Sequence, residues 1–226
     1  MEPIGKASLG ALICLAALGA TPAGAVTIAN PTNSYGSPYL SGNLQGGNQT
    51  QYFGETFTAP IAGRLTNFQF TLNTSSLQSV YGIVFGWDGT RPTDELYRSA
   101  IVPGAAGLFS FDPVGVELTQ GQMYVAFLST YGIADNAGLA TVGTCLPFAG
   151  CVSNSIANLG TLVTGNIFGD GPVFNALGYL DATFSVTIAA SAVPEPATWA
   201  MMILGMAVVG YALRRQRVTT RVVYTA

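Results

Sequence analysis

The residue types able to perform chemistry are few in this chain of 226 residues. It contains no histidine, and its only lysine is Lys6. The lack of histidine excludes Ser-His-Asp and Cys-His nucleophilic sites, and zinc sites with imidazole ligands. Without a lysine beyond Lys6, Schiff-base chemistry is excluded from the rest of the chain. Carboxylates remain, and two of them at a suitable separation could hydrolyse a glycosidic bond.

Nine carboxylates lie between residues 26 and 193: Glu55, Asp88, Asp94, Glu95, Asp112, Glu117, Asp135, Asp170 and Asp181. Several stand in turn sequences such as Asp88-Gly89 and Asp112-Pro113. We therefore expect no catalytic residue and no enzyme, and a glycan hydrolase is the weakest alternative. Only three arginines oppose these nine acids, so this region carries a net charge of −6. That charge argues against nucleic acid as a partner.

The most suggestive local cluster surrounds Trp87. Trp87, Asp88, Asp94 and Tyr97 could bind a sugar, with an aromatic ring stacked on a pyranose and carboxylates accepting hydroxyl hydrogens. Trp87 also ends an alternating apolar run, however, which favours a packed core tryptophan.

Loop carboxylates can also bind calcium through oxygen ligands. The candidates are the 88–95 segment and a looser set of Asn166, Asp170 and Asn175. The spacing matches no EF-hand, and Arg91 offers an ion-pair partner inside the first segment. Turn-forming acids are the favoured interpretation. We expect no cofactor and no metal, with calcium as the alternative.

The elements expected to position these residues are strands. Apolar residues alternate over 68–72, 81–87 and 182–188, which is the period of a half-buried strand. Further strands are predicted at 52–58 and 95–101, and a hairpin joins 116–118 to 123–128. Residues 30–51 and 145–158 read as loops. The pattern predicts an all-β exported domain over 26–193, an antiparallel β-sandwich of jelly-roll type. A barrel and a solenoid are the alternatives, although no internal repeat supports the solenoid.

Both ends of the chain carry processing or membrane signals. Residues 1–25 are typical of a secretory signal peptide, with Ala23-Gly24-Ala25 as the small-residue cleavage site. Cys145 and Cys151 should then form a disulfide in an oxidising compartment. Residues 197–213 are uncharged and predict a short transmembrane helix of about 25 Å. Arg214, Arg215 and Arg217 follow it, which places the 218–226 tail in the cytoplasm.

The segment from Val193 to Met201 reads Val-Pro-Glu-Pro-Ala-Thr-Trp-Ala-Met. Together with the short span and the arginines, it resembles the PEP-CTERM sorting signal in its PEP-x-x-W-A variant, over residues 194–217. Pro194, Glu195, Pro196 and Trp199 are the residues that match the recognition element. The chain continues past the arginines to Ala226, whereas tails of this family usually stop sooner.

The resemblance implies an exosortase as processing enzyme and an inner-membrane precursor with a periplasmic domain. The product would then be passed to the cell surface or secreted. It also implies a non-enzymatic surface or matrix protein associated with exopolysaccharide and biofilm. The alternative from the residues is a carbohydrate-binding module with its ligand site near Trp87.

Overall fold

The computed structural model describes residues 24–30, 39–42, 49–145, 159–168, 171–178, 180–191 and 196–216. These residues form two separate units. One is the β domain, within Ala23–Ser191, and the other contains the helix α1 (Pro196–Gln216). Residues 1–23 of the predicted signal peptide lie outside the described residues, as does the predicted tail at 218–226, whereas Ala25, at the end of the predicted signal peptide, begins β1.

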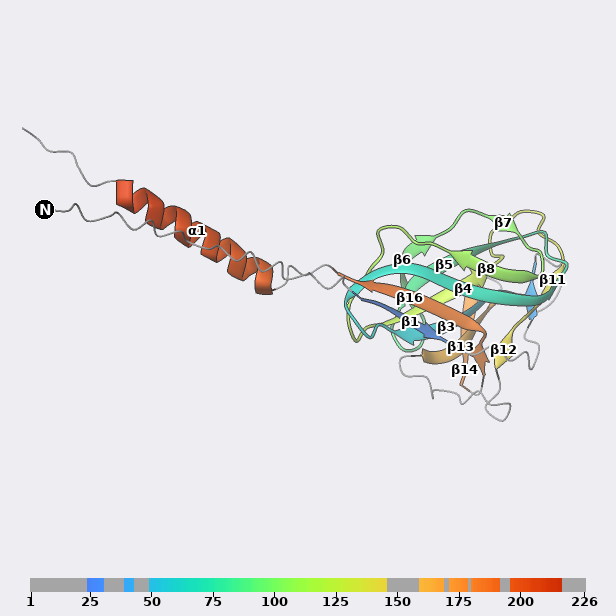
Figure 1. Ribbon diagram of the computed structural model, residues 1–226. Coiled ribbons are helices and arrows are strands. Elements are labelled where there is room, and N and C mark those ends of the chain that lie inside the picture. Colours follow the sequence, from blue (N-terminus) through green and yellow to red (C-terminus); the bar gives the residue numbers. More distant parts are fainter. Residues whose placement is uncertain are drawn as a thin grey trace, which may run out of the picture. The chain divides into compact units, whose positions relative to one another are not determined.

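The β domain is an antiparallel β-sandwich, as predicted (Figure 1). The first sheet has the order β1-β16-β4-β11-β2, and β8 and β9 also pair with β4. Its strands are β1 (Ala25–Ala29), β2 (Tyr39–Ser41), β4 (Gly63–Ser75), β8 (Gly107–Phe111), β9 (Glu117–Leu118), β11 (Leu139–Val142) and β16 (Phe184–Ala190).

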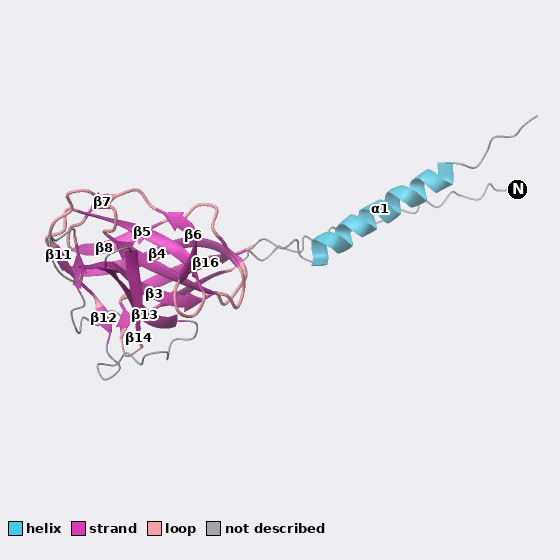
Figure 2. Cartoon of the chain, turned by 180° about the vertical axis from the view of Figure 1, so that it is seen from behind, coloured by secondary structure: helices cyan, strands magenta, loops and turns pink. Residues whose placement is uncertain are grey.

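The second sheet has the order β14-β13-β3-β10-β5-β6, with β7 paired to β5. Figure 2 labels β14, β13, β3, β5, β6 and β7 of this sheet. Its strands are β3 (Gln49–Thr58), β5 (Ser79–Trp87), β6 (Pro92–Arg98), β7 (Val102–Pro103), β10 (Met123–Ser129), β13 (Leu159–Phe168) and β14 (Gly171–Leu177). A small third sheet pairs β12 (Thr144–Cys145) with β15 (Asp181–Ala182).

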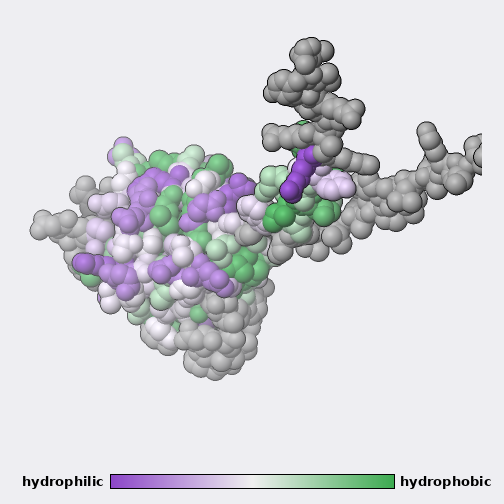
Figure 3. Space-filling view, turned by 90° about the vertical axis from the view of Figure 1, so that its left-hand side faces the viewer, coloured by the Kyte–Doolittle hydropathy of each residue, from purple (hydrophilic) through white to green (hydrophobic). Residues whose placement is uncertain are grey.

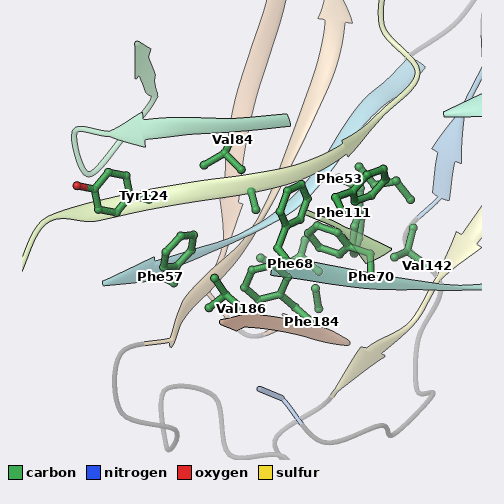
Figure 4. Close-up of a cluster of buried hydrophobic side chains, with 14 of the residues drawn as sticks. Phe53, Phe57, Phe68, Phe70, Val84, Phe111, Tyr124, Val142, Phe184 and Val186 are labelled. Atoms are coloured by element: carbon green, nitrogen blue, oxygen red, sulfur yellow. The ribbon is translucent and has the colours of Figure 1, made fainter. Parts of the chain in front are cut away.

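Aromatic side chains dominate the core between the two large sheets. Phe68 and Phe70 from β4 meet Phe53 and Phe57 from β3 and Phe184 from β16, and all five are buried (Figure 4). Phe70 and Phe184 are closest, with 4.9 Å between ring centroids. Alternation along each strand produces this arrangement, because residues two apart face the same side.

A second cluster of buried residues packs on the outer face of the second sheet. It comprises Tyr52, Tyr81, Ile83, Trp87, Val125, Phe127 and Val163. Phe127 lies directly over Gly54, where an added Cβ would come within 2.4 Å of its ring. A glycine at position 54 therefore lets the ring lie flat on the sheet. We call these seven residues the outer cluster.

Two sequence predictions about local structure are wrong. The strands at 117–118 and 123–129 do not form a hairpin, because β9 pairs with β4 and β10 pairs with β3 and β5. The turn between them, closed by a hydrogen bond from Gln122 N to Thr119 O of 3.2 Å, instead carries the chain from one sheet to the other. The predicted loop at 30–51 contains β2 and the start of β3. The loop residues 146–158 lie outside the described part.

Candidate functional site

The candidate sorting segment contains the only helix in the described part of the chain. α1 begins at Pro196, a residue suited to the first helical turn because it has no amide hydrogen to leave unpaired. Every described side chain from Trp199 to Arg214 is exposed, and Trp199 is 52% exposed. Apolar side chains thus cover all faces of this helix, as the sequence predicts. Pro194, Glu195 and Arg217 lie outside the described residues, and Arg215 lies in the last turn.

The predicted transmembrane span at 197–213 is not supported by the structure. Within the described residues, no helix combines the length and the apolar character needed to cross a membrane. Gly205, Gly210 and four alanines contribute little apolar surface to α1.

The candidate sugar site around Trp87 is not assembled as its sequence suggests. Trp87 is 8% exposed and belongs to the outer cluster. Tyr97 instead packs against the inter-sheet core, with its ring 6.0 Å from that of Phe68. The two aromatic side chains therefore lie on opposite faces of the second sheet. The interpretation of Trp87 as a packed residue agrees with its burial.

The acids near Trp87 organise a turn. Asp88 accepts hydrogen bonds of 2.8 Å from the backbone nitrogens of Thr90 and Arg91 and from the Thr90 hydroxyl. These contacts, led by the Thr90 amide, lower the pKa of Asp88 to about 2. Its carboxylate also contacts Arg91 at 3.3 Å. Asp88 therefore acts as a turn-forming residue.

The same loop offers little to a calcium ion. Glu95 pairs with Arg98 at 2.6 Å, and this hydrogen bond lowers the pKa of Glu95. Two of the three carboxylates in the 88–95 segment thus already have a cationic partner, which leaves Asp94. Asp170, from the second predicted set, lies outside the described residues. No group of three or more histidine, cysteine or acidic residues that could hold a metal occurs within the described ranges.

Two acids that the sequence did not single out are buried. Glu55 is 0% exposed and lies between Phe53 and Phe57 on β3, so it points into the sandwich. Its Oε2 accepts a hydrogen bond of 2.8 Å from Ala182 N, whereas its Oε1 has no partner. Asp181 is 2% exposed, and its Oδ1 is also unpartnered. One local signal could have indicated this burial, because Glu55 shares a strand face with Phe53 and Phe57 when side chains alternate along the strand.

Burial is the main cause that raises the pKa of Glu55 well above its ordinary range, and the Asp181 carboxylate adds to it. Burial also raises the pKa of Asp181. Glu55 therefore keeps its proton to a higher pH than an exposed glutamate does. A carboxyl that is fully buried in the sandwich does not reach the glycosidic oxygen of a polymer, so this pair does not favour the hydrolase alternative.

The cysteine prediction is met as far as the described residues extend. Cys145 is buried at the end of β12 and is disulfide-bonded. Its predicted partner Cys151 lies outside the described residues, so this pairing stays a prediction.

Comparison with known proteins adds one finding. Residues 192–217 match the PEP-CTERM protein-sorting motif. The PEP-CTERM motif covers Pro194, Glu195, Pro196 and Trp199, together with Arg214, Arg215 and Arg217. It implies export, a precursor held at the membrane, and processing by an exosortase. No curated protein and no solved structure matches the chain. The PEP-CTERM match therefore concerns how the chain is sorted. It does not extend into the β domain, whose role has to be argued from its own residues.

Proposed function

We propose that this chain is an exported, exosortase-processed protein whose β domain acts at the cell surface or in the extracellular matrix. The observation that carries the proposal is the PEP-CTERM motif at 192–217. The exosortase would cleave near Pro194 and release the β domain, which ends at Ser191. In this scheme α1 serves sorting and does not contribute to the β domain.

The proposed role of the β domain is non-enzymatic association with exopolysaccharide. Its composition supports this, since histidine and lysine are missing from residues 26–193. Its two buried acids lie away from solvent. On the face seen in Figure 3, hydrophilic and hydrophobic residues are interspersed over the β domain. Such a surface suits an uncharged, hydrated matrix better than a polyanion.

Mass spectrometry of the protein from its native host tests the sorting step. We expect the mature pool to lack residues after about Pro194 and to begin near Val26. Replacing Pro194, Glu195 and Pro196 together by alanine should leave the carboxyl terminus uncut. Ser191→Ala, which changes an exposed residue just outside the motif, is the matched control. A wild-type mature pool that ends at Ala226 would contradict the proposal.

A further inference from the structure

The outer face of the first sheet has a hollow where one strand changes its neighbour. β4 borders β16 as far as Phe70 and borders β11 from Leu72. Between these pairings, Thr71 O accepts a hydrogen bond from Gly143 N of 2.9 Å, and Gly143 O accepts one from Thr183 N of 2.8 Å. A Cβ on residue 143 would come within 2.8 Å of the Thr183 hydroxyl. Because residue 143 is a glycine, no side chain fills the space beside Thr71 and Thr183.

The hollow has a volume of about 300 Å³ and lies between β1, β16, β4 and β8. This volume is at the lower end of the range for small-molecule sites. Leu108, which is 64% exposed beside the opening, and Ala29 supply apolar surface, whereas the ring of Phe184 points away into the inter-sheet core. None of the residues that line the hollow is charged.

Three polar side chains in the lining have hydrogen-bonding capacity to spare. Asn30 donates through Nδ2 to Ala182 O at 2.9 Å, which fixes its amide and leaves Oδ1 as an acceptor. The hydroxyls of Thr71 and Thr183 have no hydrogen-bond partner among the described residues. Asn30 and Thr183 are only 7% and 8% exposed. Thr71 is half-buried, and the free acceptor of Asn30 and the two hydroxyls can bond to the hydroxyls of a ligand.

The rim of the hollow is held in place by side-chain hydrogen bonds across three strands. Ser185 on β16 donates to Gln69 Oε1 on β4 at 3.2 Å. Gln69 Nε2 in turn donates to the Ser110 hydroxyl on β8 at 3.3 Å, and Asn67 donates to the same hydroxyl at 2.8 Å. A site with rim residues fixed in this way loses little conformational freedom when it binds.

We propose that this hollow binds a neutral sugar unit of an extracellular polysaccharide. Exposed apolar surface from Leu108 with uncharged hydroxyl and amide groups beside it matches a pyranose, which has apolar C–H faces and a rim of hydroxyls. The C–H face packs on Leu108, and the sugar hydroxyls bond to Asn30, Thr71 and Thr183. This inference rests on the proposed association with exopolysaccharide. It places the sugar-binding site in this hollow and not near Trp87.

Isothermal titration calorimetry on the mature protein tests the site with neutral gluco-, galacto- and manno-oligosaccharides and with an oligouronate of equal length. We expect one neutral series to bind and the oligouronate to bind more weakly. The double variant Thr71→Val/Thr183→Val should lower affinity about tenfold or more, because it removes two hydroxyls without changing shape. Leu108→Ala should also weaken binding, and its exposed position keeps the fold intact.

Thr141→Val is the matched control, since Thr141 lies on β11 of the same sheet and does not line the hollow. Its affinity should equal that of the unmodified protein. Equal affinity in the Thr71/Thr183 double variant, preference for the oligouronate, or no binding of any neutral series would overturn the inference. The same samples report carboxyl-terminal processing by mass spectrometry, so failure of the sugar site is distinguished from failure of the sorting proposal.

Discussion

Glu55 is the residue whose environment departs furthest from what its type suggests. It stands in the aromatic core between two phenylalanines, with one oxygen bonded to a backbone amide and the other unpaired. A buried charge without a cationic partner is costly, so the folded state keeps the proton. No ion pair in the described residues involves Glu55. Protonation of Glu55 is therefore coupled to folding.

We expect the free energy of unfolding to fall as pH rises above the ordinary glutamate pKa of 4.5, because the folded pKa of Glu55 is higher. The loss continues until the pH passes the folded pKa. One proton gives a slope of at most about 1.4 kcal/mol per pH unit. Glu55→Gln should flatten this slope in urea titrations between about pH 5 and about pH 9. The control Glu117→Gln, at an exposed position, should leave the slope unchanged. An unchanged slope in Glu55→Gln would exclude the coupling between protonation of Glu55 and folding.

The position of Trp87 leads to a stability prediction. Trp87→Ala should lower the free energy of unfolding by about 3–5 kcal/mol, because it removes a large side chain from the outer cluster and leaves a cavity. Trp87→Phe should cost less, since it keeps part of the apolar volume. Equilibrium denaturation measures both. A loss below about 1 kcal/mol in Trp87→Ala would mean that the indole is not packed, and would revive the ligand interpretation.

At the scale of elements, the small β12-β15 sheet links residues of the two large sheets. Thr144 and Ala182 pair there, and Ala182 also bonds to Glu55 through its nitrogen and to Asn30 through its oxygen. A short stretch of chain thus connects the core carboxyl on β3 with the segment that follows β1. Cys145, disulfide-bonded and buried, ends β12 at the same place.

Removing the predicted disulfide tests how much this end of β12 contributes to stability. Cys145→Ser with Cys151→Ser should lower the free energy of unfolding by about 2–3 kcal/mol, the value expected for a short closed loop. Reduction of the unmodified protein should produce a similar loss, measured by thermal denaturation with and without a thiol reductant. The double variant itself should not respond to the reductant. A response in that variant would show that another thiol contact is responsible.

At the scale of the whole molecule, the chain divides into a β domain and a sorting segment. The inter-sheet core and the outer cluster are built entirely from residues 28–188. The helix α1 keeps its apolar side chains exposed. Stability of the fold and sorting of the chain are thus assigned to different residues.

A chain that ends at Ser191 should therefore retain the β domain's melting temperature, because none of the described residues beyond Ile188 belongs to the core. Differential scanning calorimetry of the full chain in detergent and of the shortened chain makes the comparison. A shortened chain that melts several degrees lower would show that the sorting segment also stabilises the β domain. Near-ultraviolet circular dichroism checks that the aromatic packing is the same in both chains.

The sequence by itself determined the sorting segment, the strand character of the domain and the faces of its clearest strands. These signals are local, because Pro-Glu-Pro, an arginine cluster and a period of two can all be read from neighbouring residues. The alternating run from Tyr81 to Trp87 is an example, since its apolar face became part of the outer cluster.

Only the tertiary structure decided which strands pair and what each polar residue faces. The turn at 119–122 looks the same whether its strands pair or belong to different sheets, and here they belong to different sheets. Burial of Glu55 and the hollow beside Thr71 depend on β15 and β16, more than one hundred residues away along the chain. Contacts of that range follow from packing of the two sheets, and no short window of sequence contains them.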